Sequence, residues 1–196
     1  MKKKILALAL GAISLSMLVH GSLAYFTAED TAHNVITSGG VDIEIVEWTL
    51  DNGILVPFPK DEPMRVMPGV TASKIVTVEN KEEEAYIRAR FAVTVKNAAG
   101  EVMELDEATR TSIIQIATND DYWLEDETDG NWFYYKDAVG TGIATEPLLR
   151  EVVFSAVNMT NEYQGCTVEI DVDAQAVQVA NNGTDVLEAA GWPIEE

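Results

Sequence analysis

Cysteine and histidine are scarce in this chain of 196 residues. It contains one cysteine, Cys166, and two histidines, His20 and His33. A single cysteine excludes an internal disulfide framework, and this set cannot supply the paired spacing of a zinc site. The same scarcity leaves little room for histidine-based catalysis. The composition therefore favours a protein that is not an enzyme.

Positive charge is also in short supply. Lysine and arginine total 13 against 33 aspartates and glutamates, which gives a formal net charge of −20. Such a chain lacks the cationic face that binds a nucleic-acid backbone, and an anionic membrane surface repels it. The longest apolar stretch, residues 5–19, falls short of the roughly 20 residues that cross a bilayer. With 47% hydrophobic residues, the chain still has enough apolar side chains for one buried core.

The first 24 residues have the pattern of a secretory signal peptide. Lys2, Lys3 and Lys4 precede the apolar stretch, and small residues lead up to a cleavage site between Ala24 and Tyr25. The alternative is an uncleaved anchor helix, which would be the protein's only contact with a membrane. Cleavage removes three lysines and no acid, so that 172 residues with a net charge of −23 remain. We therefore expect a secreted protein of the extracellular matrix or the cell surface.

Two segments alternate between apolar and polar residues with the period of a β-strand. In Ala85–Lys96 the odd positions are apolar and the even positions are largely polar, which predicts one buried face and one face in water. In residues 166–178 the acidic side chains fall in one row, as they do along a strand but not around a helix. Shorter strands are predicted at residues 41–48, 73–79, 112–117, 131–136 and 150–157, and short helical turns at 106–111 and 184–190.

Many short strands with one polar face predict an all-β domain of two antiparallel sheets packed face to face. We place this domain at residues 41–180 and a C-terminal segment at residues 181–196. Residues 25–40 precede the domain as a short, threonine-rich arm that ends in a Gly-Gly pair. Once cleavage frees its N-terminus, the arm is able to add as a strand to the edge of a neighbouring sheet. The alternative is an ordinary first strand of its own domain.

Motifs spread over most of the chain follow one order and spacing. They are AYFT at 24–27, DTAHN at 30–34 and SGGVDIE at 38–44, then VMPG at 66–69, VEN at 78–80 and AYIR at 85–88, and finally AQAVQ at 174–178 and GW at 191–192. In this order they resemble the TasA/camelysin family, exported proteins of Gram-positive bacteria. Two positions depart from the family pattern: Ala28 replaces a frequent aspartate, and three glutamates at 82–84 replace a turn that contains glycine.

The resemblance implies a jelly-roll-like β-sandwich and cleavage by a dedicated signal peptidase of the endoplasmic-reticulum type. It also implies assembly with itself or with related subunits into extracellular fibres of the biofilm matrix. In such fibres the freed arm completes the sheet of the next subunit, head to tail and open-ended. The family also includes accessory and cell-surface members. The arm residues expected to make contacts are Tyr25, Phe26, Ala28, Ala32, Val35 and Ile36.

Two other functions are alternatives. Camelysin has been described as a cell-surface metalloprotease, but this chain has no His-Glu-x-x-His motif, and only His33 remains after cleavage. We therefore assign no catalytic residue, no metal ligand and no cofactor. The other alternative is a cell-surface module that binds polysaccharide or protein through exposed aromatic side chains. Its candidate ligand surface is Trp123, Trp132 and Tyr134, and ordinary core packing is the alternative for these residues.

The acidic segment 125–131 matches a calcium-binding loop only in part. With Gly130 at the sixth loop position, the twelfth position is Lys136, which excludes an EF-hand because that position supplies a bidentate glutamate. A looser calcium site and a solvated acidic hairpin both stay open at this point.

Three further side chains have expected roles. Cys166 lies on the apolar side of its strand and is expected to be a small buried hydrophobic residue. Arg88 and Arg90 are expected to pair with carboxylates across the strands, such as Glu169 or Asp171. The strong negative charge predicts that like subunits repel one another, so that assembly should strengthen as acids protonate or as salt or divalent cations screen them.

Overall fold

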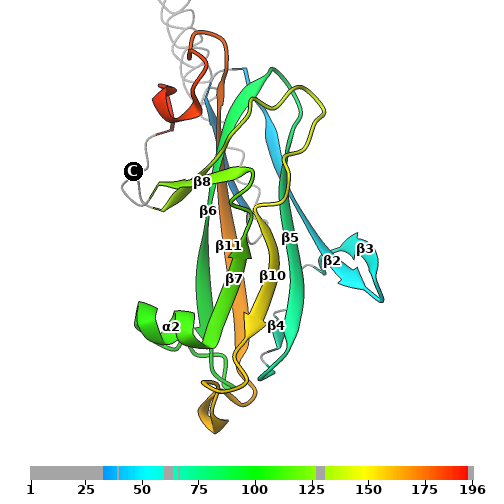
Figure 1. Ribbon diagram of the computed structural model, residues 1–196, viewed down its shortest axis with the longest axis vertical. Coiled ribbons are helices and arrows are strands. Elements are labelled where there is room, and N and C mark those ends of the chain that lie inside the picture. Colours follow the sequence, from blue (N-terminus) through cyan, green and yellow to red (C-terminus); the bar gives the residue numbers. More distant parts are fainter. Residues whose placement is uncertain (1–32, 39, 60–63, 66, 127–130, 194–196) are drawn as a thin grey trace, which may run out of the picture. The chain divides into compact units, whose positions relative to one another are not determined.

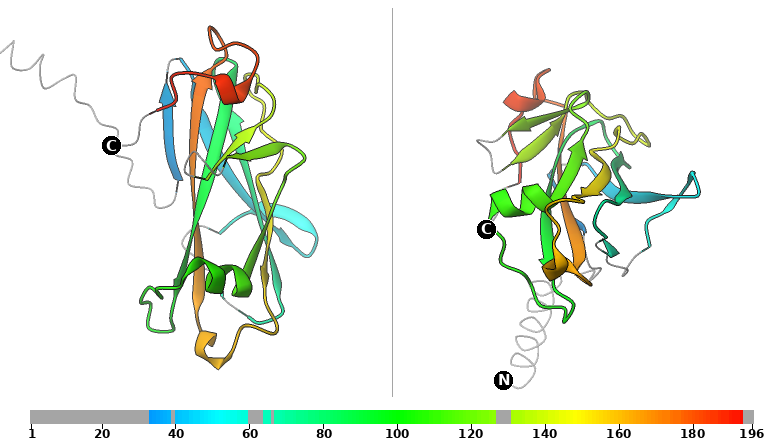
Figure 2. Two further views of the ribbon diagram at one scale, coloured as in Figure 1. Left: turned by 60° about the vertical axis from the view of Figure 1, so that its left-hand side comes forward. Right: turned by 60° about the horizontal axis from the view of Figure 1, so that its bottom comes forward.

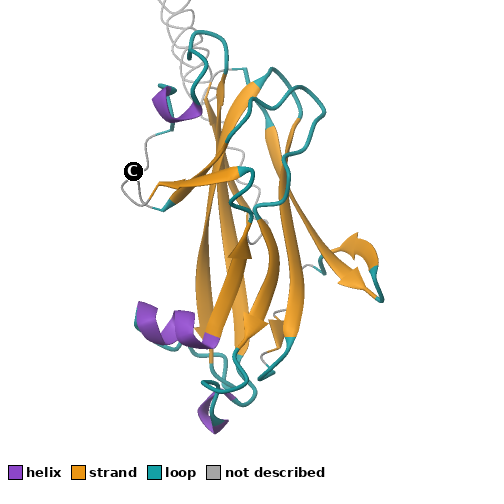
Figure 3. Cartoon of the chain, viewed as in Figure 1, coloured by secondary structure: helices purple, strands orange, loops and turns teal. Residues whose placement is uncertain are grey.

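The computed structural model describes residues 33–38, 40–59, 64–65, 67–126 and 131–193. Residues from Ala32 onward belong to one compact unit. In this unit two β-sheets, called sheet A and sheet B below, pack against each other (Figures 1 and 3). The predicted all-β sandwich is confirmed. Among the described residues, no helix is long and apolar enough to cross a membrane.

Sheet A is built around two long strands, β6 (Ala85–Lys96) and β11 (Thr167–Gln178), which pair antiparallel along their whole length. β9 (Trp132–Tyr135) and then β8 (Trp123–Asp126) follow on the far side of β6. β1 (His33–Ser38) and β4 (Met64–Arg65) both pair with β11. The pair of β1 and β11 is parallel, whereas the other described strand pairs are antiparallel.

Sheet B contains five strands in the order β3–β2–β5–β10–β7. Their bounds are β2 (Ile43–Asp51), β3 (Ile54–Pro57), β5 (Thr71–Asn80), β7 (Ile114–Thr118) and β10 (Leu149–Phe154). Within the described ranges, helical structure is limited to α2 (Glu107–Ile113) and two short 3-10 turns, η1 (Asn161–Tyr163) and η2 (Val186–Glu188). α2 begins after Asp106, whose carboxylate accepts a hydrogen bond from the Thr109 N–H at 2.7 Å and thereby acts as its N-cap.

Most predicted strands are confirmed in place. β6 has the predicted bounds, β11 begins one residue later than predicted, and each of the five shorter strands overlaps its predicted segment. β7 begins only at Ile114, because α2 continues through Ile113 before the chain becomes extended. Both predicted helical turns are present as α2 and η2. The elements that had no prediction are β3, β4, β8 and η1.

The core lies between the two sheets and is lined by alternate residues of each long strand, as period-2 alternation requires. It is dominated by β-branched aliphatic side chains, among them Ile43, Ile45, Val76, Val78, Ile87, Val168 and Val172. A charged pair also points inward beside them. The Lys74 Nζ lies 2.5 Å from Oε1 of Glu47 and 4.0 Å from the centre of the Phe58 ring. Burial lowers the pKa of Lys74, and the Glu47 carboxylate opposes that shift.

The outer face of β6 differs from the prediction. The alternation predicts water next to Tyr86 and Arg88, yet both side chains are buried. The C-terminal segment folds back here, and Val186, Ala189 and Trp192 pack over this end of sheet A. Figure 2 shows the segment in red beside β6 and β9. Along β6, the outward-facing side chains at even positions are partly or fully exposed only from residue 90 to residue 96.

Candidate assembly edge

The residues predicted for cleavage and assembly fall mostly before the first described strand. Val35 and Ile36 lie in β1. The other predicted residues lie outside the described residues, and they are Ala24, Tyr25, Phe26, Ala28 and Ala32.

β1 forms one margin of sheet A (Figure 2). All six of its residues pair with β11, in a register that places Val35 opposite Ala174 and Ile36 opposite Gln175. Among the described residues, β11 is its only strand partner. A strand with one partner is held by half the backbone ladder that holds a central strand, and its other side is a template for pairing.

The edge of β11 that receives β1 also receives β4. β6 occupies the whole of the opposite edge, so both smaller strands must share the remaining one. β4 covers Thr167 and Val168, while β1 covers the stretch from Val172 onward. Residues 169–171 lie between them, and within the described part of the chain no strand pairs with them on that side. Two separate short strands therefore pair with this edge of β11, and neither covers its whole length.

The outer face next to this edge carries charged pairs between β6 and β11. The Lys96 Nζ lies 2.6 Å from Oε2 of Glu169, and Arg90 Nε donates to Oδ2 of Asp173 at 3.2 Å. The predicted cross-strand pairing of Arg90 with a carboxylate is thus confirmed in kind, but Asp173, directly opposite it in the register, is the partner. Such partly exposed pairs typically contribute about 0–1 kcal/mol each.

Arg88 lies opposite the neutral Gln175 in the register, and not opposite Glu169 or Asp171. Its guanidinium donates twice to Oε1 of Gln175, at 2.9 and 2.7 Å, and once to the hydroxyl of Tyr134 at 2.9 Å. The ring centres of Trp132 and Trp192 lie 4.4 and 4.8 Å from its Cζ. Stacking on aromatic faces and hydrogen bonds to neutral acceptors hold this cation under the C-terminal segment.

The predicted aromatic ligand surface is not exposed. The side chains of Trp123, Trp132 and Tyr134 belong to residues that are only 2–4% accessible to solvent, so the alternative of core packing is correct for them. Trp123 donates from Nε1 to the Glu146 carbonyl at 3.0 Å, and its ring meets Tyr135 edge to face. Trp132 and Tyr134 instead face outward on β9, where the C-terminal segment covers them. Alternation alone does not reveal this cover.

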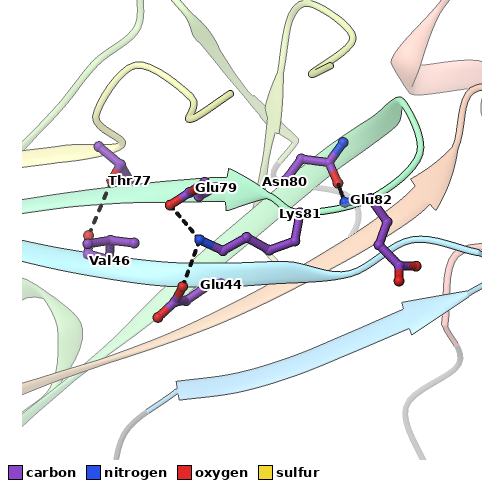
Figure 4. Close-up of polar contacts among 7 residues, drawn as sticks. All are labelled: Glu44, Val46, Thr77, Glu79, Asn80, Lys81 and Glu82. Carbon is purple, nitrogen blue, oxygen red and sulfur yellow. Dashed lines mark hydrogen bonds and ion pairs between the residues drawn. The ribbon is translucent and has the colours of Figure 1, made fainter. Parts of the chain in front are cut away.

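A short corner connects sheet B to sheet A between β5 and β6 (Figure 4). Asn80 is fully buried, and its side-chain amide donates to the carbonyls of Glu83 and Val139, each at 2.7 Å. Its Oδ1 accepts the Glu82 N–H at 3.3 Å. Lys81 links β2 and β5 from the exposed side, since its Nζ lies near both Glu44 of β2 and Glu79 of β5. These carboxylates raise the pKa of Lys81.

Metal and thiol chemistry have little support in the described residues. No group of three or more histidine, cysteine or acidic side chains is placed there to hold a metal ion. Residues 127–130 of the acidic segment lie outside the description. Cys166 is buried, as expected, and its Sγ lies 3.6 Å from the sulfur of Met103. Burial raises the pKa of Cys166, which keeps it in the unreactive thiol form.

Comparison with protein-family models, with curated proteins and with solved structures found no match. Family membership therefore stays a prediction that rests on the sequence motifs.

The acidic row of β11 ends in a neutral amide, Gln175, and the register places this residue opposite Arg88. The Asn52-Gly53 dipeptide is a strong sequence signal for a two-residue turn, and it forms the turn between β2 and β3. No local sequence pattern indicates that Trp192 covers Arg88.

Proposed function

We propose that this chain is an exported structural subunit, or an accessory subunit, of extracellular fibres of the biofilm-matrix type. Subunits would join through the N-terminal arm, which leaves its own domain and pairs with the next copy. The observation that supports this proposal best is β1, a six-residue strand at the start of the described chain that has a single strand partner. The motif resemblance to the TasA/camelysin family supports it independently.

Exchange of β1 between copies is physically simple. The pairing of β1 with β11 within one chain uses backbone groups that the β1 of another copy presents identically. An exchange in the same register therefore replaces each intramolecular hydrogen bond with an equivalent intermolecular one. The arm of each copy would enter the next, so that the contacts do not close and a filament grows.

Charge should control this assembly. The processed chain of net charge −23 repels its own copies at low salt and neutral pH. Turbidity and filament mass should therefore rise as pH falls toward the carboxylate range, or as salt or divalent cations are added. Assembly that is insensitive to both would argue against contacts between intact acidic subunits.

A pair of cysteines tests the strand exchange directly. Asn34 and Asp173 are Cα partners in the β1–β11 register, and neighbouring strands are about 4.8 Å apart, which suits a disulfide. The double variant N34C/D173C, oxidised as a monomer, would lock β1 onto its own sheet. We expect electron microscopy to show filaments from the reduced variant and none from the oxidised one. Buried Cys166 should not compete for the new thiols.

The matched controls are the two single variants, N34C and D173C. When mixed and oxidised during assembly, they should form a disulfide between two chains, which a non-reducing gel detects as a dimer. Filaments that form equally well from the locked chain, or the absence of any dimer in the mixture, would refute assembly through β1. A second variant, with residues 25–37 deleted, should stay folded by circular dichroism and form no filaments.

A further inference from the structure

The hairpin of β2 and β3 projects from sheet B (Figure 1). β2 pairs with β5 from Ile43 to Trp48, and beyond Trp48 its pairing continues only with β3. The turn at the tip consists of Asn52 and Gly53, whose φ angles of 50° and 80° suit a tight two-residue hairpin. The last three residues of β2 therefore leave the sandwich together with β3.

The root of the hairpin is firmly held. Where the ladder between β2 and β5 ends, the Ser73 hydroxyl accepts the Leu50 N–H at 2.7 Å and lies 2.6 Å from the Thr49 hydroxyl. On the inner side, Lys74 pairs with Glu47 and lies under the ring of Phe58. The base of the hairpin is thus tied to β5 by hydrogen bonds and an ion pair.

The projecting part exposes large apolar side chains. Leu50, Ile54 and Leu55 are 51%, 67% and 50% accessible. Leu50 and Leu55 are Cα partners and therefore lie on the same face of the hairpin, where Trp48 and Pro57 form the next pair. Three large hydrophobic residues that are at least half exposed within six positions mark this tip as a contact surface.

β3 also has an open backbone edge. It is the last strand of sheet B among the described residues, and its sequence, Ile-Leu-Val-Pro, carries no charge. The Phe58 N–H bonds to Glu47, so the alternation directs the backbone of Leu55 away from β2. Pro57 has no N–H, which leaves Leu55 as the residue of β3 that offers both a donor and an acceptor outward. Soluble proteins usually protect such edges with charges.

Charge favours a second copy of this chain as the occupant. Two molecules of net charge −20 repel each other over most of their surfaces. Between Trp48 and Phe58, however, Asp51 is the only charged residue. A cationic partner would find a single carboxylate at this tip, whereas two acidic copies meet here with little local repulsion. The two hairpins are also self-complementary, because a two-fold axis places Leu55 opposite Leu55 and joins both pairs of outward backbone groups.

We propose that the β2–β3 hairpin docks onto the same hairpin of a second copy, with the two β3 strands antiparallel. Leu50 and Leu55 of each copy then form one apolar row across the joined sheets. The surface is far smaller than the roughly 20–30 residues per side of a stable interface, so a single contact is weak. Repeated along a filament, such contacts add up and join filaments side by side. This lateral role rests on the proposed function, but the contact between two hairpins does not.

One experiment distinguishes the hairpin contact from the proposed assembly through β1. The locked N34C/D173C chain cannot exchange β1, so sedimentation equilibrium of this chain measures the hairpin contact alone. We expect weak dimerisation that strengthens with added salt, and at least about tenfold weaker association when Leu50→Thr and Leu55→Thr are introduced together. The matched control is Ile143→Thr with Val157→Thr, which removes two exposed hydrophobic residues outside the hairpin and should leave association unchanged.

In the unlocked chain, L50T/L55T should give filaments of normal length that no longer bundle in electron micrographs. An absence of filaments in every variant would count against the proposed function and leave the sedimentation result standing. Association that L50T/L55T does not weaken, or that I143T/V157T weakens equally, would overturn the hairpin contact. Binding to neutral phosphatidylcholine vesicles that depends on Leu50 and Leu55, without self-association, would overturn it in favour of a lipid surface.

Discussion

The buried pair of Lys74 and Glu47 offers a sharp test of the sandwich. Both side chains point into the interior from neighbouring strands, and they are 5% and 12% exposed. Replacing Lys74 with methionine keeps the length and apolar stem of the side chain but leaves the Glu47 carboxylate inside without the ammonium. Removing one partner of a buried pair typically costs 3–5 kcal/mol, and because Glu47 retains some contact with water, we expect about 3 kcal/mol.

For a domain of this size, about 3 kcal/mol corresponds to a decrease in Tm of roughly 6–12 °C. The measurement is urea and thermal unfolding followed by tryptophan fluorescence and circular dichroism. The double variant K74M/E47M removes both charges, and its stability should return to within about 1 kcal/mol of the wild-type value or exceed it.

The control for this pair is Lys81→Met. Lys81 also bridges two carboxylates between β2 and β5, but it does so in solvent, so its loss should change stability much less. If K74M were no less stable than K81M, the pair would not be buried in solution. If K74M/E47M were as unstable as K74M, the cost would come from packing and not from an uncompensated charge.

Three further predictions concern other parts of the fold. Asn80→Leu removes one buried and one partly buried hydrogen bond at the corner between the sheets and should cost about 2–4 kcal/mol in urea unfolding, whereas a loss below about 1 kcal/mol would contradict the geometry. Trp192→Ala removes one aromatic face from Arg88 and should cost about 1–3 kcal/mol in urea unfolding, and hydrogen exchange of the backbone amides near Tyr86 should become faster as the covered face is exposed. The Thr109 N–H lowers the pKa of Asp106 below its ordinary 3.8, so the stabilisation is present above that pH and is lost as pH falls through the folded-state value. Asp106→Asn keeps the cap without titrating, so thermal melts between about pH 2 and pH 6 should show a steeper acid loss for the wild type, and parallel curves would refute this role.

The strands of this protein were largely predictable because their signal is local. In Ala85–Lys96 every second residue is apolar, and that alternation is sufficient to identify a strand and its core face. The cap at Asp106 is local in the same sense, since the group that it binds lies three residues away. β4, with two residues, is too short for any periodicity to show.

The candidate site was less predictable, because its properties depend on segments far apart in the chain. Alternation predicts which face of β6 carries Arg88, but not that Trp192, more than a hundred positions later, covers it. The same applies to Trp132 and Tyr134, which are exposed or buried according to what lies over β9. Charge pairing of Arg90 was predictable in kind, whereas the choice of Asp173 required the register.

The sequence by itself determined the scarcity of cysteine and histidine, the strong negative charge, the positions of most strands and the core-facing side of each long strand. These follow from composition and from short-range periodicity, which the tertiary fold does not alter. Only the tertiary structure decided that β1 pairs in parallel with β11, that the C-terminal segment buries one end of sheet A, and that the β2–β3 hairpin leaves sheet B with its leucines exposed. The physical reason is that a side chain's exposure depends on what is packed over it, and in a sandwich the covering segment usually comes from a distant part of the chain.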